Sequence, residues 1–196
     1  MKRLLIALVP LVVACAVVAA PAAAVTQPHW YVNSVKLTKK KTVKTEAGLT
    51  IGPFLLIPGT PPVTVSCKFR DAETLENPAS GGAGVDKMKM FTATECGPNP
   101  CPVNSAGVQP KFKVKSLGLP WKTELVEVPP IADEIQGVTL EFSCKKMGSV
   151  VLSGTLLPWV NVNQLEFTST TGTLSGAPVV GFDNFLPPNT VEAINP

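Results

Sequence analysis

Three groups of neighbouring carboxylates are the residues of this chain that come closest to catalytic machinery. In chain order they are Asp71 with Glu73 and Glu76, Glu124 with Glu127, and Asp133 with Glu134. Glycoside hydrolysis needs two carboxyl groups that face each other across a cleft. All three groups lie in or near predicted turns, so a solvated surface is the favoured interpretation and a secreted carboxylate-dependent hydrolase is the alternative. A calcium site in the acidic turn is a further alternative, and its signal is weak because the segment lacks the Asp-x-Asp-x-Asp-Gly pattern of a calcium loop. No metal ligand is assigned, and no cofactor is expected.

The chain contains one histidine, His29. A Ser-His-Asp or Cys-His arrangement would have to use this residue as its base. The surrounding Gln27-Pro28-His29-Trp30 is typical of the entry into a strand. No catalytic residue is therefore assigned, and the protein is expected not to be an enzyme.

Four cysteines outside the leader predict two disulfide bonds, because an even count is typical of exported chains. They are Cys67, Cys96, Cys101 and Cys144. The turn-forming Gly97-Pro98-Asn99-Pro100 favours a Cys96–Cys101 bond, which leaves Cys67 to pair with Cys144. A zinc site is disfavoured because the cysteines are not spaced as Cys-x-x-Cys pairs.

Candidate ligand-binding residues are basic or aromatic. Lys39, Lys40 and Lys41 belong to a basic run at a predicted hairpin tip, where they either are simply solvated or bind an anionic polymer. Trp121 and Trp159 each follow a Leu-Pro pair and either pack at the edge of the core or stack on sugars. The alternating lysines of 111–115 predict an edge strand, since lysine discourages edge-to-edge pairing.

The elements that carry these residues are predicted to be short antiparallel strands. Proline and glycine number 20 and 15 and are spread along the chain, which breaks helices. Alternating polarity, as in Thr64–Phe69 and Thr139–Cys144, predicts strands with one buried face. The candidate strands span residues 30–37, 49–57, 63–69, 87–94, 111–116, 123–128, 138–144, 149–157, 164–170 and 177–182. This pattern predicts an all-β fold, either an antiparallel β-sandwich or a distorted barrel.

The segment Asp71–Asp86 is the least regular stretch of the chain. Its first part is expected to form one helical turn, and the glycine-rich part after it a flexible loop. The largest surface excursion is expected there.

Three short landmarks recur at shifts of 76 to 78 residues. Lys44-Thr45-Glu46 resembles Lys122-Thr123-Glu124, and Ser66-Cys67-Lys68 resembles Ser143-Cys144-Lys145. Phe91-Thr92-Ala93-Thr94 likewise resembles Phe167-Thr168-Ser169-Thr170. One interpretation is a duplicated β-unit, with repeats at about 30–105 and 106–185; the other is recurrence through composition alone.

Residues 1–24 are predicted to be a cleaved secretory signal peptide, which leaves a single β domain over 25–196. Lys2 and Arg3 precede an apolar run, and Ala22-Ala23-Ala24 supplies small residues for cleavage. The alternative is acylation of Cys15, which would make the protein a lipoprotein on the outer face of the cell membrane. The expected location is therefore secreted or extracellular, with membrane attachment only if Cys15 carries lipid.

Charge gives no indication of a nucleic-acid partner. The formal net charge is +3, and the loss of Lys2 and Arg3 with the leader brings the mature chain close to neutrality. No mature stretch has the roughly 18 apolar residues of a spanning helix.

Three motifs resemble those of secreted actinobacterial proteins of unknown function. They are Trp30-Tyr31-Val32-Asn33, Gly118 to Leu125, and Leu165-Glu166-Phe167. This resemblance implies a bacterial, exported protein and carries no activity with it. The expected function is a non-enzymatic binding or structural role, with an envelope glycan or another surface protein as partner.

Overall fold

The computed structural model describes residues 26–195, which form fourteen β-strands and no helix. Among these residues there is no helix with the length and apolarity to span a membrane. The predicted signal peptide and Cys15 lie outside the described residues. The strands are β1 (His29–Val32), β2 (Val35–Lys36), β3 (Lys41–Phe54), β4 (Val63–Leu75), β5 (Val85–Gly97), β6 (Phe112–Ser116), β7 (Trp121–Val126), β8 (Ala132–Cys144), β9 (Gly148–Leu156), β10 (Trp159–Asn161), β11 (Gln164–Phe167), β12 (Thr173–Leu174), β13 (Ala177–Phe185) and β14 (Val191–Ile194).

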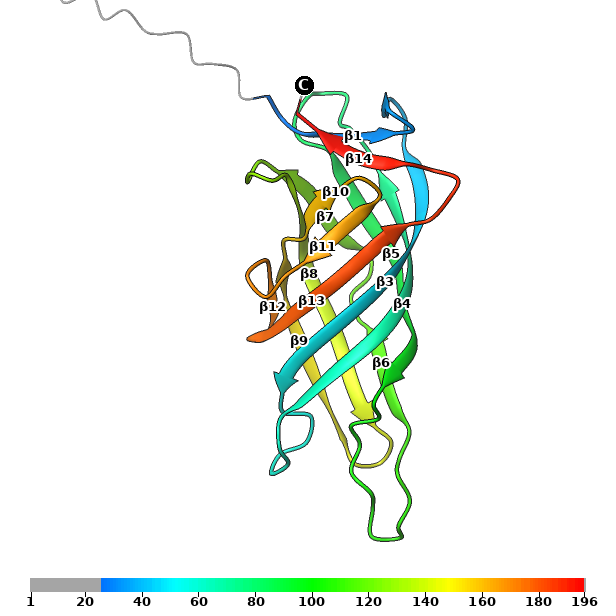
Figure 1. The fold of residues 1–196 in the computed structure, drawn as a ribbon, viewed down its shortest axis with the longest axis vertical. Helices are drawn as coiled ribbons and strands as arrows, with labels where there is room; N and C mark the ends of the chain where they lie inside the picture. The colour runs from blue at the N-terminus through cyan, green and yellow to red at the C-terminus, as the bar shows by residue number, and fades with distance from the viewer. Residues whose placement is uncertain (1–25, 196) are drawn as a thin grey trace, which may run out of the picture.

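Eight of these strands close into an antiparallel barrel (Figure 1). Their order is β8-β10-β11-β13-β3-β4-β5-β7, and β7 pairs with β8 to complete the circle. The other half of β8 pairs with β9 and β6. β6 stands at the end of the sheet, with Lys113 and Lys115 exposed, as expected of an edge strand. The all-β prediction is confirmed, and the architecture is the distorted barrel.

Alternating side chains explain why these segments form barrel walls. Along β4, Val65, Cys67 and Phe69 are buried while the residues between them are exposed. β3 and β4 pair without interruption from Lys41–Leu75 to Ile51–Val65, so both strands present their apolar faces to the interior. The predicted two-residue period is therefore confirmed in the longest strand pair.

The prediction for Asp71–Asp86 is wrong in its first part. Asp71 to Leu75 continues β4 and forms no helical turn, because it pairs with the first half of β3 on one side and with β5 on the other. Only the stretch after Glu76 leaves the barrel wall as a loop. The excursion that reaches furthest beyond the barrel is the connection between β5 and β6 (Figure 1).

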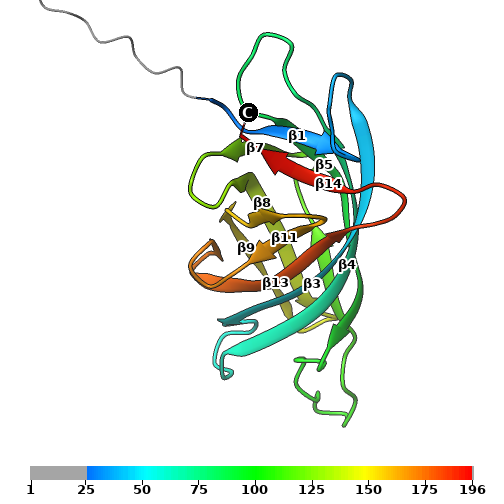
Figure 2. The same cartoon turned by 45° about the horizontal axis from the view of Figure 1, so that its top comes forward.

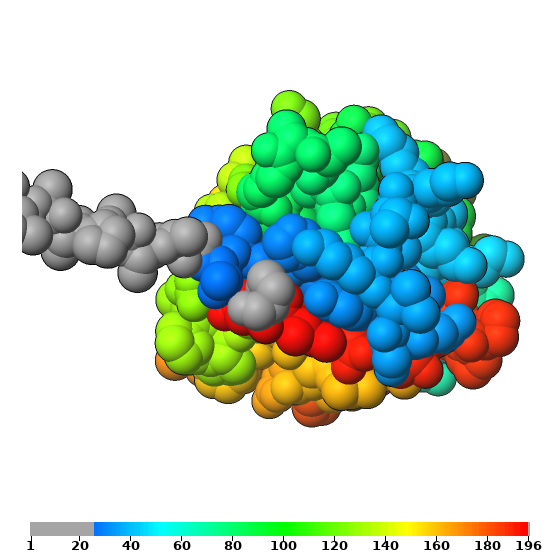
Figure 3. All heavy atoms as spheres, turned by 90° about the horizontal axis from the view of Figure 1, so that it is seen from above, coloured from blue at the N-terminus to red at the C-terminus, as the bar shows by residue number. Residues whose placement is uncertain are grey.

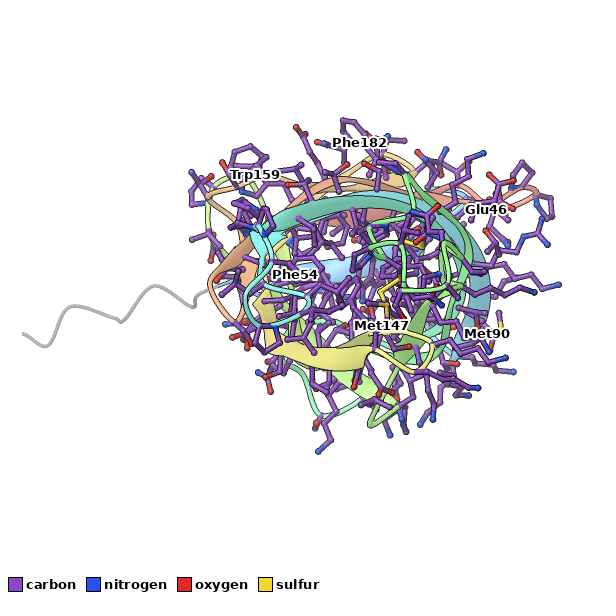
Figure 4. The ribbon with its side chains drawn as sticks, turned by 90° about the horizontal axis from the view of Figure 1, so that it is seen from below. Glu46, Phe54, Met90, Met147, Trp159 and Phe182 are labelled. Atoms are coloured by element: carbon purple, nitrogen blue, oxygen red, sulfur yellow. A yellow bond between two sulfur atoms is a disulfide. The ribbon has the colours of Figure 1, made fainter. Side chains whose placement is uncertain are left out.

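The end of the barrel away from the chain termini is filled by aromatic side chains. Phe54 lies near the middle of this end when the molecule is seen from below (Figure 4). Its ring centroid is 4.9 Å from that of Phe142, which is 6.2 Å from that of Phe112. Further inside, Phe91 stacks on Phe69 at 4.4 Å and contacts Trp121 at 5.4 Å. The interior on this side of the barrel is thus a packed apolar core.

A separate small sheet closes the other end. β1 pairs with both β14 and β2, and the sheet lies across the barrel mouth (Figure 2). Asn77 fastens it, since its amide accepts from the Trp30 N–H at 2.8 Å and donates to the carbonyls of Trp30 and Leu37. The Trp30 ring is fully buried and meets Phe185 edge-on at 6.4 Å. From above, this cap and the segment after β4 cover most of the barrel end (Figure 3).

The cysteines pair differently from the prediction. Cys67 is bonded to Cys96, and Cys101 to Cys144, with Cα–Cα distances of 4.1 and 5.6 Å. Cys67 and Cys96 are direct cross-strand neighbours on β4 and β5, a proximity that strand register sets and the local turn does not reveal.

The Gly97–Pro100 segment does not close back on Cys96. Asn99 accepts the Cys101 N–H and donates to the Pro110 carbonyl, which turns Cys101 into the barrel end against β8. The predicted Cys96–Cys101 and Cys67–Cys144 bonds are therefore both wrong.

The recurring landmarks occupy different strand positions. Cys67 is near the beginning of β4, whereas Cys144 is the last residue of β8. Phe91 lies in the middle of β5, whereas Phe167 ends β11. Thr45 and Thr123 share one property, since both hydroxyls are buried inside the barrel.

Candidate functional site

A layer of buried carboxyl groups crosses the barrel between the apolar core and the cap. We call it the acid layer. Its members are Asp71, Glu73, Asp86, Asp133 and Asp183, together with the hydroxyls of Thr45 and Thr123. None of the five carboxyl residues is more than 2% exposed.

Strand periodicity places each of these groups inside the barrel. On β4, Asp71 and Glu73 continue the inward series that begins at Val65 and ends at Leu75. On β13, Asp183 lies two residues before the buried Phe185. The acidic side chains therefore occupy ordinary inward-facing positions near the capped ends of their strands.

Two subgroups can be distinguished in the acid layer. Asp71, Glu73 and Asp183 each contribute one oxygen to a set in which all oxygens lie within 4.8 Å of one another. Thr45 faces this set, because it is the cross-strand partner of Asp71. In the second subgroup, Asp86 is the cross-strand partner of Thr123, and the Thr123 hydroxyl also lies near Asp133.

Within the part of the chain that the structure describes, no basic side chain compensates these carboxyl groups. All ten carboxyl oxygens are buried and lack a partner in hydrogen-bonding geometry, and so do the hydroxyls of Thr45 and Thr123. Among residues 26–195, no lysine or arginine side chain is buried. An uncompensated buried charge is costly, so these groups must hold protons or share a cation.

Burial raises the pKa of every carboxyl group in the acid layer. It raises the pKa of Asp71 to about 10, with repulsion from Asp183 and Asp86 adding to the effect. The pKa of Asp133 rises to about 7 through burial, although the nearby Thr123 hydroxyl opposes the rise. Burial also raises the pKa of Asp183 to about 6, against the opposing influence of Asp71 and Thr45. The pKa of Glu73 moves well above its usual value for the same first reason, burial.

The acid layer is thus a proton-holding or cation-holding site and has no open approach for a substrate. Comparisons with protein-family models, curated proteins and solved structures found no match.

A second candidate site lies on the outside of the barrel. Its residues form two rows across β10, β11 and β13, which we call the outer face: Trp159, Glu166 and Phe182 in one row, and Asn161, Gln164 and Asn184 in the other. Phe182 is 46% exposed, and Trp159 is partly exposed. Both rings lie on the outside of the barrel wall (Figure 4).

Hydrogen bonds hold the polar groups of the outer face. The Asn161 amide donates to Glu166 at 3.1 Å, and the Gln164 amide donates to Asn184 at 2.9 Å. Beyond Phe182 the first row continues through Gly48 to Lys68, whose ammonium pairs with Glu95 at 2.8 Å. The outer face therefore joins aromatic surface to ordered amide and carboxylate groups.

The other predicted binding residues lie away from the outer face. Trp121 is buried and donates its indole N–H to the Leu117 carbonyl at 2.9 Å, so it presents no ring face to solvent. Lys39, Lys40 and Lys41 are exposed beside the cap, and Lys40 pairs with Glu76 at 2.9 Å. Of the predicted binding residues, only Trp159 belongs to the outer face.

The expectation that the carboxylates are solvated is wrong for Asp71, Glu73 and Asp133 and correct for Glu124 and Glu127. The signal that sequence analysis missed is alternation carried through polar residues. In Phe69-x-Asp71-x-Glu73-x-Leu75 the acids share the face of the apolar residues on either side. The same spacing links Asp86 to Met88, and an acid at a core-facing position is the expected mark of a site.

Proposed function

We propose that this protein is exported and binds a glycan of the cell envelope through its outer face, without catalysing a reaction. The observation that carries the proposal is the pairing of Trp159 and Phe182 with an ordered set of amides. Aromatic rings stack on the apolar faces of sugars, and amide and carboxylate groups bond to sugar hydroxyls.

The spacing within the outer face suits a chain of sugars. Trp159 and Phe182 are separated by the single residue Glu166 on the intervening strand. Two inter-strand steps place their backbones about 10 Å apart. A chain lying across the strands would contact both rings and the Asn161–Asn184 row beside them.

Export is supported by the disulfide bonds, which are consistent with an oxidising, extracellular environment. The hydrolase alternative has less support, because the carboxyl groups that converge are sealed inside the barrel. On the convex exterior, Glu46 and Glu95 are engaged in ion pairs with Arg70 and Lys68.

Replacing the aromatic residues of the outer face tests the proposal. In a pull-down with insoluble peptidoglycan and chitin, the wild-type protein is expected to be retained. Trp159→Ala and Phe182→Ala are each expected to weaken retention about tenfold or more, because truncating a central aromatic contact costs on the order of 2 kcal/mol. The melting temperature of each variant is measured alongside to show that it is folded.

Met90→Ala is the matched control, because Met90 is an exposed apolar residue elsewhere on the barrel exterior (43% exposed; Figure 4). It is expected to bind as the wild type does. Equal retention of all three variants would refute the outer face as the binding site, and release of soluble sugars would favour the hydrolase.

A further inference from the structure

We propose that Asp71, Glu73 and Asp183, with the hydroxyl of Thr45, form an interior binding site for a calcium-type divalent cation. This inference is independent of glycan binding, since the site lies inside the barrel and the outer face outside it.

The oxygen positions carry the geometric part of the proposal. One oxygen from each of the three carboxyl groups lies within 4.8 Å of the others. Calcium binds oxygen at about 2.3–2.6 Å, so two ligands on opposite sides of the ion are separated by about 5 Å. The three oxygens therefore already stand at distances that one ion can bridge. The hydroxyl of Thr45, the cross-strand partner of Asp71, would be the fourth ligand.

The unsatisfied polar atoms give a second, independent reason. The Thr45 hydroxyl is 1% exposed, faces Asp71 across the strand pair and has no hydrogen-bond partner. Buried hydroxyls are nearly always satisfied, so an orphaned one beside orphaned carboxylates indicates a missing partner. A cation would give the three convergent carboxyl oxygens a shared partner.

Ligand chemistry selects the class of ion. Every candidate ligand is a carboxylate or hydroxyl oxygen, which suits a hard cation and disfavours zinc or copper. Magnesium keeps several of its waters, and this site is closed above by the cap and below by the apolar core. Calcium, which accepts six to eight oxygen ligands in flexible geometry, fits the site better.

Closure of the site determines how it is loaded. Because Trp30 and Val191 of the cap are fully buried, the ion has to enter before the cap docks or during its transient opening. The experiment therefore uses protein that is unfolded, stripped with a chelator and refolded with calcium chloride, magnesium chloride or neither. Bound metal is counted by elemental analysis after gel filtration, and the melting temperature is measured in parallel.

Wild-type protein refolded with calcium is expected to hold about one ion per chain and to melt about 3–6 °C higher at a tenfold excess over Kd. Asp71→Asn, Glu73→Gln and Asp183→Asn are each expected to abolish both bound calcium and the shift. Since each variant replaces a buried carboxyl group that has to hold a proton when no metal is bound, it is expected to fold without metal at least as well as the wild type. If these acids had only a structural role, their replacement would not remove calcium binding while leaving metal-free folding intact.

Asp133→Asn is the matched control, because it removes an equally buried carboxyl group that is outside the convergent set. It is expected to keep the calcium-dependent shift. Absence of bound calcium in refolded wild-type protein would overturn the proposal, as would an equal shift with magnesium or a shift that survives Asp71→Asn. None of these results bears on retention by glycans.

Discussion

Metal-free protein is expected to be most stable near pH 4 and to lose several kcal/mol of unfolding free energy as the pH rises through 7. The cause is the acid layer. Burial raises the pKa of Asp183 to about 6 and that of Asp133 to about 7, whereas an unfolded chain titrates its aspartates near 3.9.

Whether the unfolding free energy rises or falls with pH depends on which state, folded or unfolded, holds more protons. Between the unfolded and the folded pKa, the folded state keeps protons that the unfolded state has released, so stability falls with increasing pH. The stabilisation that comes from protonated Asp183 and Asp133 is fully present below about pH 4. It is lost as the pH rises past about 6 for Asp183 and about 7 for Asp133. Each unit of pKa difference corresponds to about 1.4 kcal/mol. Asp71, with a pKa of about 10, extends the decline into the alkaline range.

Urea unfolding of chelated protein at a series of pH values measures this dependence. Asp133→Asn is expected to flatten the curve between about pH 4 and 7, because an amide does not titrate. Glu46→Gln, a change in an exposed ion pair, is expected to leave the curve unchanged. A stability that rises between pH 4 and 7 would contradict the burial of these acids.

Removing the disulfide bond between Cys101 and Cys144 is expected to cost about 4 kcal/mol of unfolding free energy. The bond joins residues 43 apart, and closing a loop of that length restricts the unfolded chain by about this amount. The double variant Cys101→Ala/Cys144→Ala is compared with the wild type by urea unfolding at about pH 5, where the acid layer is largely protonated.

The unfolding free energy of the variant Cys67→Ala/Cys96→Ala is measured in the same way. Its bond spans 29 residues, so the expected loss is slightly smaller. Peptide mapping without reduction is expected to join Cys67 to Cys96 and Cys101 to Cys144. A peptide that joins Cys67 to Cys144 would contradict the observed strand register.

The strands themselves were readable in the sequence because their signal is local. In Val65-x-Cys67-x-Phe69, three residues of one face stand two apart, and any strand with one buried side must show that pattern. The edge position of residues 112–116 was readable for a similar reason, since its lysines mark a strand that pairs on one side only. Neither inference needs a partner strand to be known.

The acid layer and the disulfide pairing were not readable, because both depend on register between distant segments. Asp71 meets Asp183 only when β13 pairs with β3 and β3 with β4, across more than 100 residues of chain. Cys67 opposes Cys96 for the same reason, while the turn after Cys96 suggested a closer partner.

The amino-acid sequence alone determined an all-β chain with alternating faces and four cysteines suited to an oxidising compartment. The tertiary structure alone decided that those faces close into a barrel and that five acids from four strands meet beneath a cap. It also decided that Trp159 and Phe182 lie in one row on the exterior. The physical reason is that alternation is set by neighbours in the chain, whereas barrel closure is set by burying all apolar faces at once.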